Sequence, residues 1–234
     1  RKGSSIKLTI DARLTAYVSE IFPEGYRGAV VIQNYATGEV LSWVSKPDYD
    51  PYNAGGDSVE DTAYLNRCLQ GLYTPGSVFK LVTLASAIES DPNVLNQTFL
   101  CNGTWEYEGG KIVCAGKTAH GEITLATALE KSCNVTFGKL AYQLGLDRLR
   151  ATAEKLGFNE NLKFEDFTIY NSQFPNSISN MSDLVWAGIG QGKVLVTPMH
   201  MAMITSSIAN GGAMVKPTLV QQITKTTGVI VQGA

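Results

Sequence analysis

The sequence has only two histidines, no C-x-x-C pair and no apolar stretch near the roughly 20 residues needed to cross a bilayer. It also lacks an excess of one charge, since 19 Lys and Arg stand against 21 Asp and Glu. This balance provides no electrostatic reason to expect DNA, RNA or anionic lipid as a partner. We therefore expect no nucleic-acid partner and no membrane anchor within these 234 residues.

The cysteines also lack nearby histidines at the spacing typical of zinc ligands, so the sequence predicts neither a metal site nor a cofactor. Cys68 and Cys133 are interpreted as small buried residues. Cys101 and Cys114 flank a polar, Gly-containing segment that is typical of a hairpin. Spacing alone does not establish disulfide geometry, so a bridge between them stays open; if formed, it would indicate an extracytoplasmic location.

Strand and helix patterns occupy different parts of the chain. Alternating apolar residues predict strands near the start, and a block of helical patterns follows. The first helix of that block, Ser77 to Glu89, is apolar around most of its circumference, which indicates a buried central helix. Segregated strands and helices favour an α+β fold, an antiparallel sheet with a helical layer, and one domain over residues 1–234. The ranges that carry the pattern are 6–10, 29–33, 39–44, 125–131, 135–144, 146–156, 199–209, 218–224 and 229–232.

Ser77 and Lys80 have the spacing of a nucleophile and its base. Ser77 begins the buried helix, where backbone N–H groups and the helix dipole favour negative charge. Lys80 lies three residues later, on the same face of a helix, among apolar neighbours that favour its neutral form. A capping Ser with a solvated Lys is the simpler interpretation, and Ser4 to Lys7 repeats the same S-x-x-K pattern.

A second polar pair, Ser132 and Asn134, lies at the junction of two helical patterns. The Ser132 hydroxyl could pass a proton to a leaving amine, and the Asn134 amide could bind a substrate amide. Taken alone, these residues are more typical of a cap for the helix that begins near Val135.

Together the two motifs point to a family, because S-x-x-K with S-x-N is typical of penicillin-binding proteins and related β-lactamases. The segment Tyr64 to Lys80 resembles the nucleophile segment of class B penicillin-binding proteins, including Asn66-Arg67 and Pro75-Gly76. The segment from His120 to Asn134 is similar to their second motif, and Gly190-Gln191-Gly192 with Thr197-Pro198 resembles their next landmark.

The resemblance implies the penicillin-binding protein and serine β-lactamase fold. It also implies roles: Ser77 is the acylated nucleophile, Lys80 the acylation base, Ser132 the proton shuttle and Asn134 a ligand of the donor peptide. The implied substrate is the D-Ala-D-Ala end of a peptidoglycan stem peptide, which β-lactams mimic. The implied place is the extracytoplasmic face of a bacterial membrane, in a longer protein that carries an anchor.

The third family motif, K-T-G, has no match. Lys117-Thr118-Ala119 lacks the Gly and precedes Ser132, and Lys225-Thr226-Thr227-Gly228 has an inserted residue and is typical of a hairpin turn. We expect a transpeptidase domain that is truncated at its C-terminus, with an incomplete sheet, impaired activity and a tendency to self-associate.

Two other functions use the same fold. A serine β-lactamase needs a Glu, with an Asn four residues later, downstream of the second motif, and the chain has none there. A non-turnover β-lactam-sensing domain would also be acylated. A triad through His120 or His200 is a third and weaker alternative.

Overall fold

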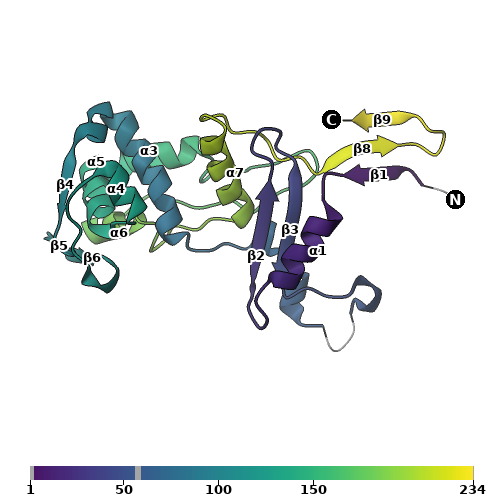
Figure 1. Cartoon of the computed structure of the whole chain (residues 1–234), viewed down its shortest axis with the longest axis horizontal. Helices are drawn as coiled ribbons and strands as arrows, with labels where there is room; N and C mark the ends of the chain where they lie inside the picture. The colour runs from purple at the N-terminus through teal and green to yellow at the C-terminus, as the bar shows by residue number, and fades with distance from the viewer. Residues whose placement is uncertain (1–2, 56–58, 234) are drawn as a thin grey trace. The chain divides into compact units, whose positions relative to one another are not determined.

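The computed structural model describes residues 3–55 and 59–233 (Figure 1). Its contacts group into two compact units. Unit 1 comprises Arg1–Leu72, Asn161–Asn171 and Thr197–Ala234, and unit 2 comprises Tyr73–Glu160 and Ser172–Val196. All four motif residues belong to unit 2. Among the described residues, no helix is both long and apolar enough to cross a bilayer.

Unit 1 contains two small antiparallel sheets with helices beside them. One sheet has the order β1-β8-β9, and the other is the hairpin β2-β3. Helix α1 begins after Asp11, whose carboxylate accepts from two backbone N–H groups, and α7 begins with Pro198 after Thr197. The elements are β1 Ser5–Leu8, α1 Ala12–Ile21, β2 Gly28–Gln33, β3 Val40–Lys46, α2 Arg67–Gln70, α7 Pro198–Ala209, β8 Val220–Thr224 and β9 Ile230–Gly233.

Unit 2 contains the helical block and two further strand pairs. Strand β4 pairs antiparallel with β7, and β5 pairs with β6. The long helix α5 changes direction at Gly145, which has a φ of 75°. The elements are α3 Lys80–Ser90, β4 Thr98–Cys101, β5 Thr104–Tyr107, β6 Gly110–Val113, β7 Gly121–Thr124, α4 Leu125–Glu130, α5 Asn134–Lys155 and α6 Met181–Ala187.

The core of unit 2 lies between α3, α5, α6 and the short strands (Figure 1). Phe137 and Ile112 are completely buried in it. Gly138 in α5 has no room for a larger residue, because an added Cβ would lie 2.9 Å from the Ile112 side chain. This packing holds the first turn of α5 beside α3 and thereby positions both polar motifs.

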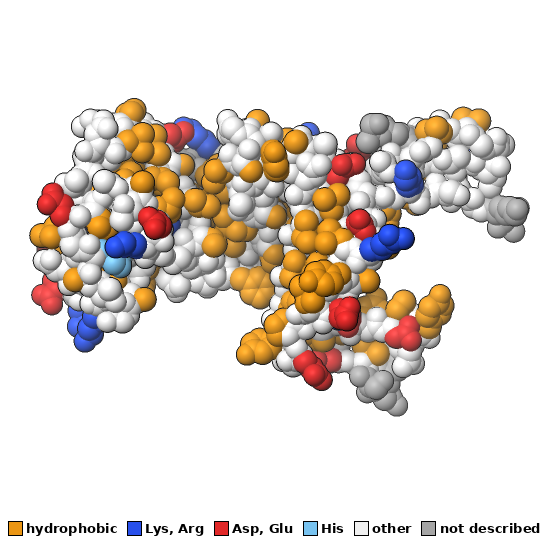
Figure 2. Space-filling view, in the orientation of Figure 1, with side chains coloured by type: hydrophobic (Ala, Val, Ile, Leu, Met, Phe, Trp, Pro, Cys, Tyr) orange, Lys and Arg blue, Asp and Glu red, His pale blue; other side chains and the backbone are white. Residues whose placement is uncertain are grey.

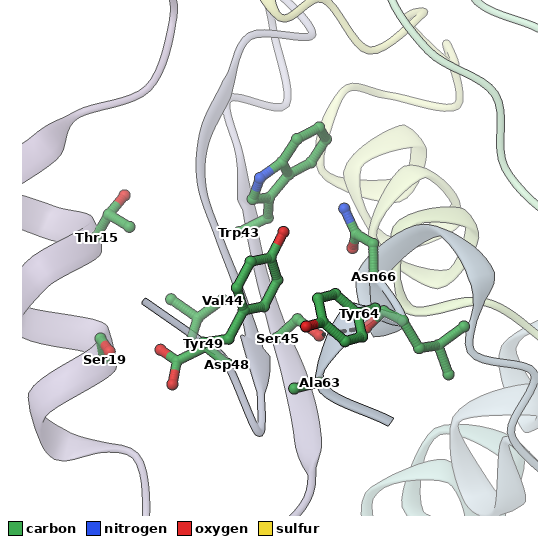
Figure 3. Close-up of a pocket in the computed structure, with 11 residues that line it drawn as sticks. Thr15, Ser19, Trp43, Val44, Ser45, Asp48, Tyr49, Ala63, Tyr64 and Asn66 are labelled. Carbon is green, nitrogen blue, oxygen red and sulfur yellow. Dashed lines mark hydrogen bonds between the residues drawn. The ribbon is translucent and has the colours of Figure 1, made fainter. Parts of the chain in front are cut away.

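Unit 1 has its own core and surface features. Trp43 of β3 packs edge-on against Phe167 with ring centroids 5.5 Å apart. A cavity of about 360 Å³ opens between α1, β3 and the segment before α2, where the rings of Tyr49 and Tyr64 lie 4.8 Å apart (Figure 3). Hydrophobic side chains also gather on the surface over α1 and the β2–β3 hairpin (Figure 2).

The α+β prediction with antiparallel strands is confirmed, although the strands form four small sheets among the described residues instead of one. The interpretation of Thr226 to Gly228 as a hairpin turn is also confirmed. The β8–β9 turn is closed by the Gly228 N–H, which donates to the Lys225 carbonyl at 2.9 Å, and Gly228 has a φ of 82°.

Candidate active site

Ser77 lies in a short turn of 3₁₀ helix, Gly76–Phe79, that leads directly into α3. Its side chain is exposed to solvent. The turn is held from behind by Gly190, whose carbonyl accepts from the Gly76 N–H at 2.8 Å. Gly190 has a φ of 74°, and a Cβ there would lie 2.1 Å from the Gly76 carbonyl oxygen. The Gly190 landmark therefore supports the nucleophile turn, a role that the sequence did not reveal.

Lys80 is 1% exposed and lies behind the exposed serine. Its Nζ is 3.3 Å from Ser77 Oγ. The same nitrogen is 2.8 Å from Ser132 Oγ, 2.7 Å from the Ser132 carbonyl oxygen and 2.7 Å from Asn134 Oδ1. The structure thus brings all four predicted residues together around one amine. The Ser77 and Lys80 side chains lie within hydrogen-bond reach, as a nucleophile and its base must.

Four oxygens surround the Lys80 Nζ, whereas the amine makes three hydrogen bonds in either protonation state. The ammonium form donates all three, and the neutral form donates two and accepts one. The contact with Ser77 Oγ, at 3.3 Å the longest of the four, is compatible with the serine hydroxyl donating to the neutral amine. The geometry therefore suits proton transfer from Ser77 to Lys80.

Burial lowers the pKa of Lys80 from its usual 10.5 to about 8. Cys133 and Cys114 act in the opposite direction, because negative charge on their sulfurs would stabilise the ammonium form. The effect of burial dominates. A substantial fraction of Lys80 is then neutral near pH 8 and able to accept a proton.

Ser132 is placed by the end of α4. It has a φ of 50°, a left-handed conformation that is rare outside glycine. The N–H of Cys133 donates to the Ala128 carbonyl at 2.8 Å, and the N–H of Ser132 donates to the Leu129 carbonyl at 2.9 Å. These two bonds form a Schellman motif that ends α4. The turn directs both the carbonyl and the hydroxyl of Ser132 toward Lys80.

Asn134 is the first residue of α5, and its side-chain amide is held at both ends. Its Oδ1 accepts from Lys80, and its Nδ2 donates to the carbonyl of Val113 at 2.9 Å. The amide therefore connects the nucleophile helix with the end of β6. Its assignment as a ligand of the donor peptide stays a prediction.

The other sequence matches to catalytic motifs do not have the structural surroundings that those motifs need. Lys7, in the second S-x-x-K copy, is exposed on strand β1. Lys117 follows Gly116 in a loop and has a φ of 55°, so Lys117-Thr118-Ala119 is not a sheet strand. His200 is completely buried in α7, in unit 1.

Cys68 and Cys133 are buried and a hairpin, β5–β6, lies between Cys101 and Cys114, as the sequence predicts. Cys101 ends β4 and Cys114 follows β6, so they lie at the base of the β5–β6 hairpin and not on its two strands. They are not bridged, and their sulfurs are 3.7 Å apart. Cys133 and His120 join them, and the four ligand atoms lie within 4.8 Å of one another. This removes the spacing argument on which the expectation of no metal site rested.

Comparison with known proteins identifies the family. A model of the penicillin binding protein transpeptidase domain matches residues 28–233. The peptidoglycan D,D-transpeptidase MrdA of Escherichia coli K12 is 29% identical in an alignment that covers 93% of this chain and 37% of the relative. The stage V sporulation protein D of Bacillus subtilis 168 is 30% identical over 95% of this chain and 35% of the relative. The chain thus spans well under half the length of these curated relatives.

Solved structures agree. The crystal structure of PBPA from Mycobacterium tuberculosis superposes with a TM-score of 0.91 and 26% identity, covering all of this chain and 59% of that one. The penicillin G acyl-enzyme complex of that protein superposes with a TM-score of 0.90. Because the family model, the sequence relatives and the structural neighbours coincide, the chain belongs to the class B penicillin-binding protein transpeptidase family.

Proposed function

We propose that this chain carries the acylation machinery of a peptidoglycan D,D-transpeptidase and that Ser77 forms the acyl-enzyme. The observation that carries the proposal is the exposed Ser77 hydroxyl 3.3 Å from the amine of the buried Lys80. Nucleophile and base within hydrogen-bond reach, with the base oriented by further groups, is the geometry that serine acyl transfer requires.

In the first step, neutral Lys80 accepts the Ser77 proton while Ser77 Oγ attacks a carbonyl carbon. Burial supplies the neutral amine, since it lowers the pKa of Lys80 to about 8. The Ser132 hydroxyl is 2.8 Å from the same amine and can hand the proton to the leaving nitrogen. Asn134 keeps Lys80 in place through its Oδ1 and, in our proposal, binds the donor peptide through its remaining N–H.

The proposed donor is the D-Ala-D-Ala end of a stem peptide, and β-lactams are proposed to acylate the same serine. Two findings support this: the relative MrdA is named a peptidoglycan D,D-transpeptidase, and PBPA structures exist as acyl-enzymes with penicillin G, imipenem and ceftriaxone. We propose that residues 1–234 act as one transpeptidase domain, on the extracytoplasmic side of a bacterial membrane.

The test is mass spectrometry after incubation with a labelled penicillin, in this chain and in the longest form of the protein. A persistent penicillin adduct, together with an acyl-enzyme from a D-Ala-D-Ala peptide that an amine acceptor releases, supports a transpeptidase. Absence of any adduct in both forms would overturn the proposal. The Ser77→Ala variant is the control, and it should remain unlabelled.

Rapid turnover of the penicillin would instead indicate a β-lactamase, and a penicillin adduct without any acyl-enzyme from the peptide would indicate a sensor. Glu89 has an Asn four residues later but precedes the second motif, and the structure disfavours it as a base for turnover, because its carboxylate is already held by Thr152 at 3.0 Å and by Lys155 at 3.2 Å. Self-association of the chain stays a prediction, motivated by exposed apolar residues such as Tyr17 and Ile21 on α1, and sedimentation tests it.

A further inference from the structure

Three thiols and one imidazole nitrogen meet at a single point in unit 2. The Cys114 sulfur is 3.7 Å from the sulfurs of both Cys101 and Cys133. The His120 Nδ1 is 3.4 Å from the Cys101 sulfur and 3.9 Å from the Cys114 sulfur. The three cysteines are buried and the histidine is half-buried. This cluster of Cys101, Cys114, His120 and Cys133 plays no direct part in the proposed acylation.

These distances are those of a tetrahedral zinc site. Zinc binds thiolate sulfur at about 2.3 Å and histidine nitrogen at about 2.0 to 2.1 Å. At tetrahedral angles these bond lengths separate two sulfurs by about 3.8 Å and a sulfur from a nitrogen by about 3.6 Å. The two sulfur–sulfur separations of 3.7 Å lie close to the first value, the sulfur–nitrogen separations of 3.4 and 3.9 Å lie on either side of the second, and all four atoms are within 4.8 Å of one another. A disulfide would require sulfurs about 2.05 Å apart, and hydrophobic packing alone does not explain an imidazole nitrogen directed at the sulfurs.

Backbone N–H groups support the sulfurs, as they do for negatively charged thiolate ligands. Backbone hydrogen bonding from Gly103 and His120 favours the thiolate form of Cys101, and that from Val135 favours the thiolate form of Cys114. The Cys133 sulfur caps α5 and accepts from the N–H of Thr136 at 3.4 Å.

The chain segments that carry the ligands are fixed to one another. The N–H of His120 donates to the Cys101 carbonyl, and the N–H of Cys114 donates to the Gly103 carbonyl. Gly103 has a φ of 82°, and a Cβ there would lie 2.2 Å from the Lys117 carbonyl oxygen. Glycine at this position therefore permits the close approach that brings β4 and the loop after β6 together.

We propose that Cys101, Cys114, His120 and Cys133 bind one zinc ion. Three thiolates and an imidazole select a soft or borderline cation and disfavour magnesium and calcium, which prefer oxygen ligands. Each thiol releases its proton to solvent as it binds. The site stands independently of the proposed function, because its evidence is the geometry of the four ligands.

The proposed ion has a consequence for the second motif. Cys133 lies between Ser132 and Asn134, whose oxygens contact Lys80. A metal bond to Cys133 holds the residue that links Ser132 and Asn134, and so holds the left-handed turn at Ser132. This consequence rests on the proposed function. A second consequence also rests on it: outside the cytoplasm, the bound ion would protect the neighbouring cysteine thiols from oxidation.

The experiment measures zinc in protein purified without chelator, with cobalt substitution as the spectroscopic probe of thiolate ligands. The informative variant is Cys133→Ser, because serine is a good helix cap and preserves the start of α5. His120→Ala removes the nitrogen ligand. Cys68→Ser is the matched control, since Cys68 is completely buried in unit 1, outside the cluster.

The wild type and Cys68→Ser should contain about one zinc per chain and show the cobalt–thiolate charge-transfer band. Cys133→Ser and His120→Ala should lose both. A chelator should lower the thermal midpoint of the wild type, zinc should restore it, and Cys133→Ser should respond to neither. Zinc binding without penicillin acylation would leave the site standing and count against the proposed function alone.

Wild-type protein that takes up neither zinc nor cobalt would overturn the site. So would a disulfide between Cys101 and Cys114 in the purified protein, or a Cys133→Ser variant that binds zinc as the wild type does.

Discussion

The pattern S-x-x-K occurs twice in this chain, at Ser4 to Lys7 and at Ser77 to Lys80, and the two copies differ in backbone. The first enters strand β1, where residues three apart face opposite sides, and its lysine is exposed. The second spans a helical turn, where residues three apart share a face, and its lysine is buried beside the serine. The pattern therefore makes a site only where the helical period and burial act together.

Replacing each of the two lysines with alanine should give the largest difference in acylation rate between the two copies. Lys80→Ala removes the proposed base, and general-base catalysis contributes about 10²- to 10⁴-fold to rate. We expect penicillin acylation of Ser77 to fall by that factor, whereas Lys7→Ala should leave it unchanged. The measurement is the rate of adduct formation in variants whose thermal unfolding shows a retained fold. Comparable losses in both variants would contradict the comparison.

A substitution at Gly190 should disrupt the contact that holds the turn Gly76–Phe79, which carries Ser77. An alanine Cβ there would lie 2.1 Å from the Gly76 carbonyl and 2.6 Å from the Phe79 Cβ, so Gly190→Ala should cost about 3 kcal/mol and slow acylation. Gly192→Ala is the matched control: its φ is 70°, yet a Cβ there meets nothing within 4 Å. It should cost about 1 kcal/mol.

Denaturant unfolding of both glycine variants checks this difference. Equal destabilisation would show that backbone conformation alone matters at Gly190 and that its contact with the nucleophile turn does not.

The effect of the Ser132 hydroxyl on acylation can be measured separately from the effect of its left-handed backbone on stability. Ser132→Ala and Ser132→Gly both remove the proposed proton shuttle, so both should slow acylation about 10²-fold. Glycine accepts a φ of 50° without strain, so Ser132→Gly should be about 1 kcal/mol more stable than Ser132→Ala. Acylation rates check the loss of the hydroxyl, and thermal unfolding checks the difference in stability. Near-normal acylation in either variant would exclude Ser132 as the proton shuttle.

The rate of acylation should depend on pH through the protonation of Lys80, with a smaller change for each pH unit than the substitutions above produce. Its pKa is lowered from 10.5 to about 8, so the amine is protonated below pH 8 and neutral above it. Acylation should rise about tenfold per pH unit below pH 8 and level off above it. The pH profile of adduct formation checks this, with Lys7→Ala as a control of unchanged profile. A flat profile between pH 6 and about 9 would argue against a lysine base.

Local features were predictable from sequence because their causes are local. Asp11 caps α1, and Thr197 with Pro198 starts α7, since cap preferences depend on a few neighbouring residues. The pair Ser77 and Lys80 was predictable for the same reason, because one helical turn joins them. The family resemblance added Ser132 and Asn134, which a short pattern alone could not distinguish from a helix cap.

Features that depend on contacts between distant segments were not predictable. The cysteine and histidine ligands come from β4, the loop after β6, the residue before β7 and the cap of α5, and no C-x-x-C spacing marks them. The role of Gly190 was hidden as well, because it depends on contact with Gly76. The pairing of strands from distant segments was not predictable for the same reason: the described residues form four small sheets, where the sequence predicted one.

The most direct test of the central claim is to locate the penicillin adduct by peptide mapping in the longest form of the protein. The account predicts a single modified serine, Ser77, in the peptide that contains Gly76 to Phe79, and no modification in the peptide that contains Ser4. An adduct on any other residue, or complete labelling of the Ser77→Ala variant, would contradict the claim that the Lys80-facing serine is the nucleophile.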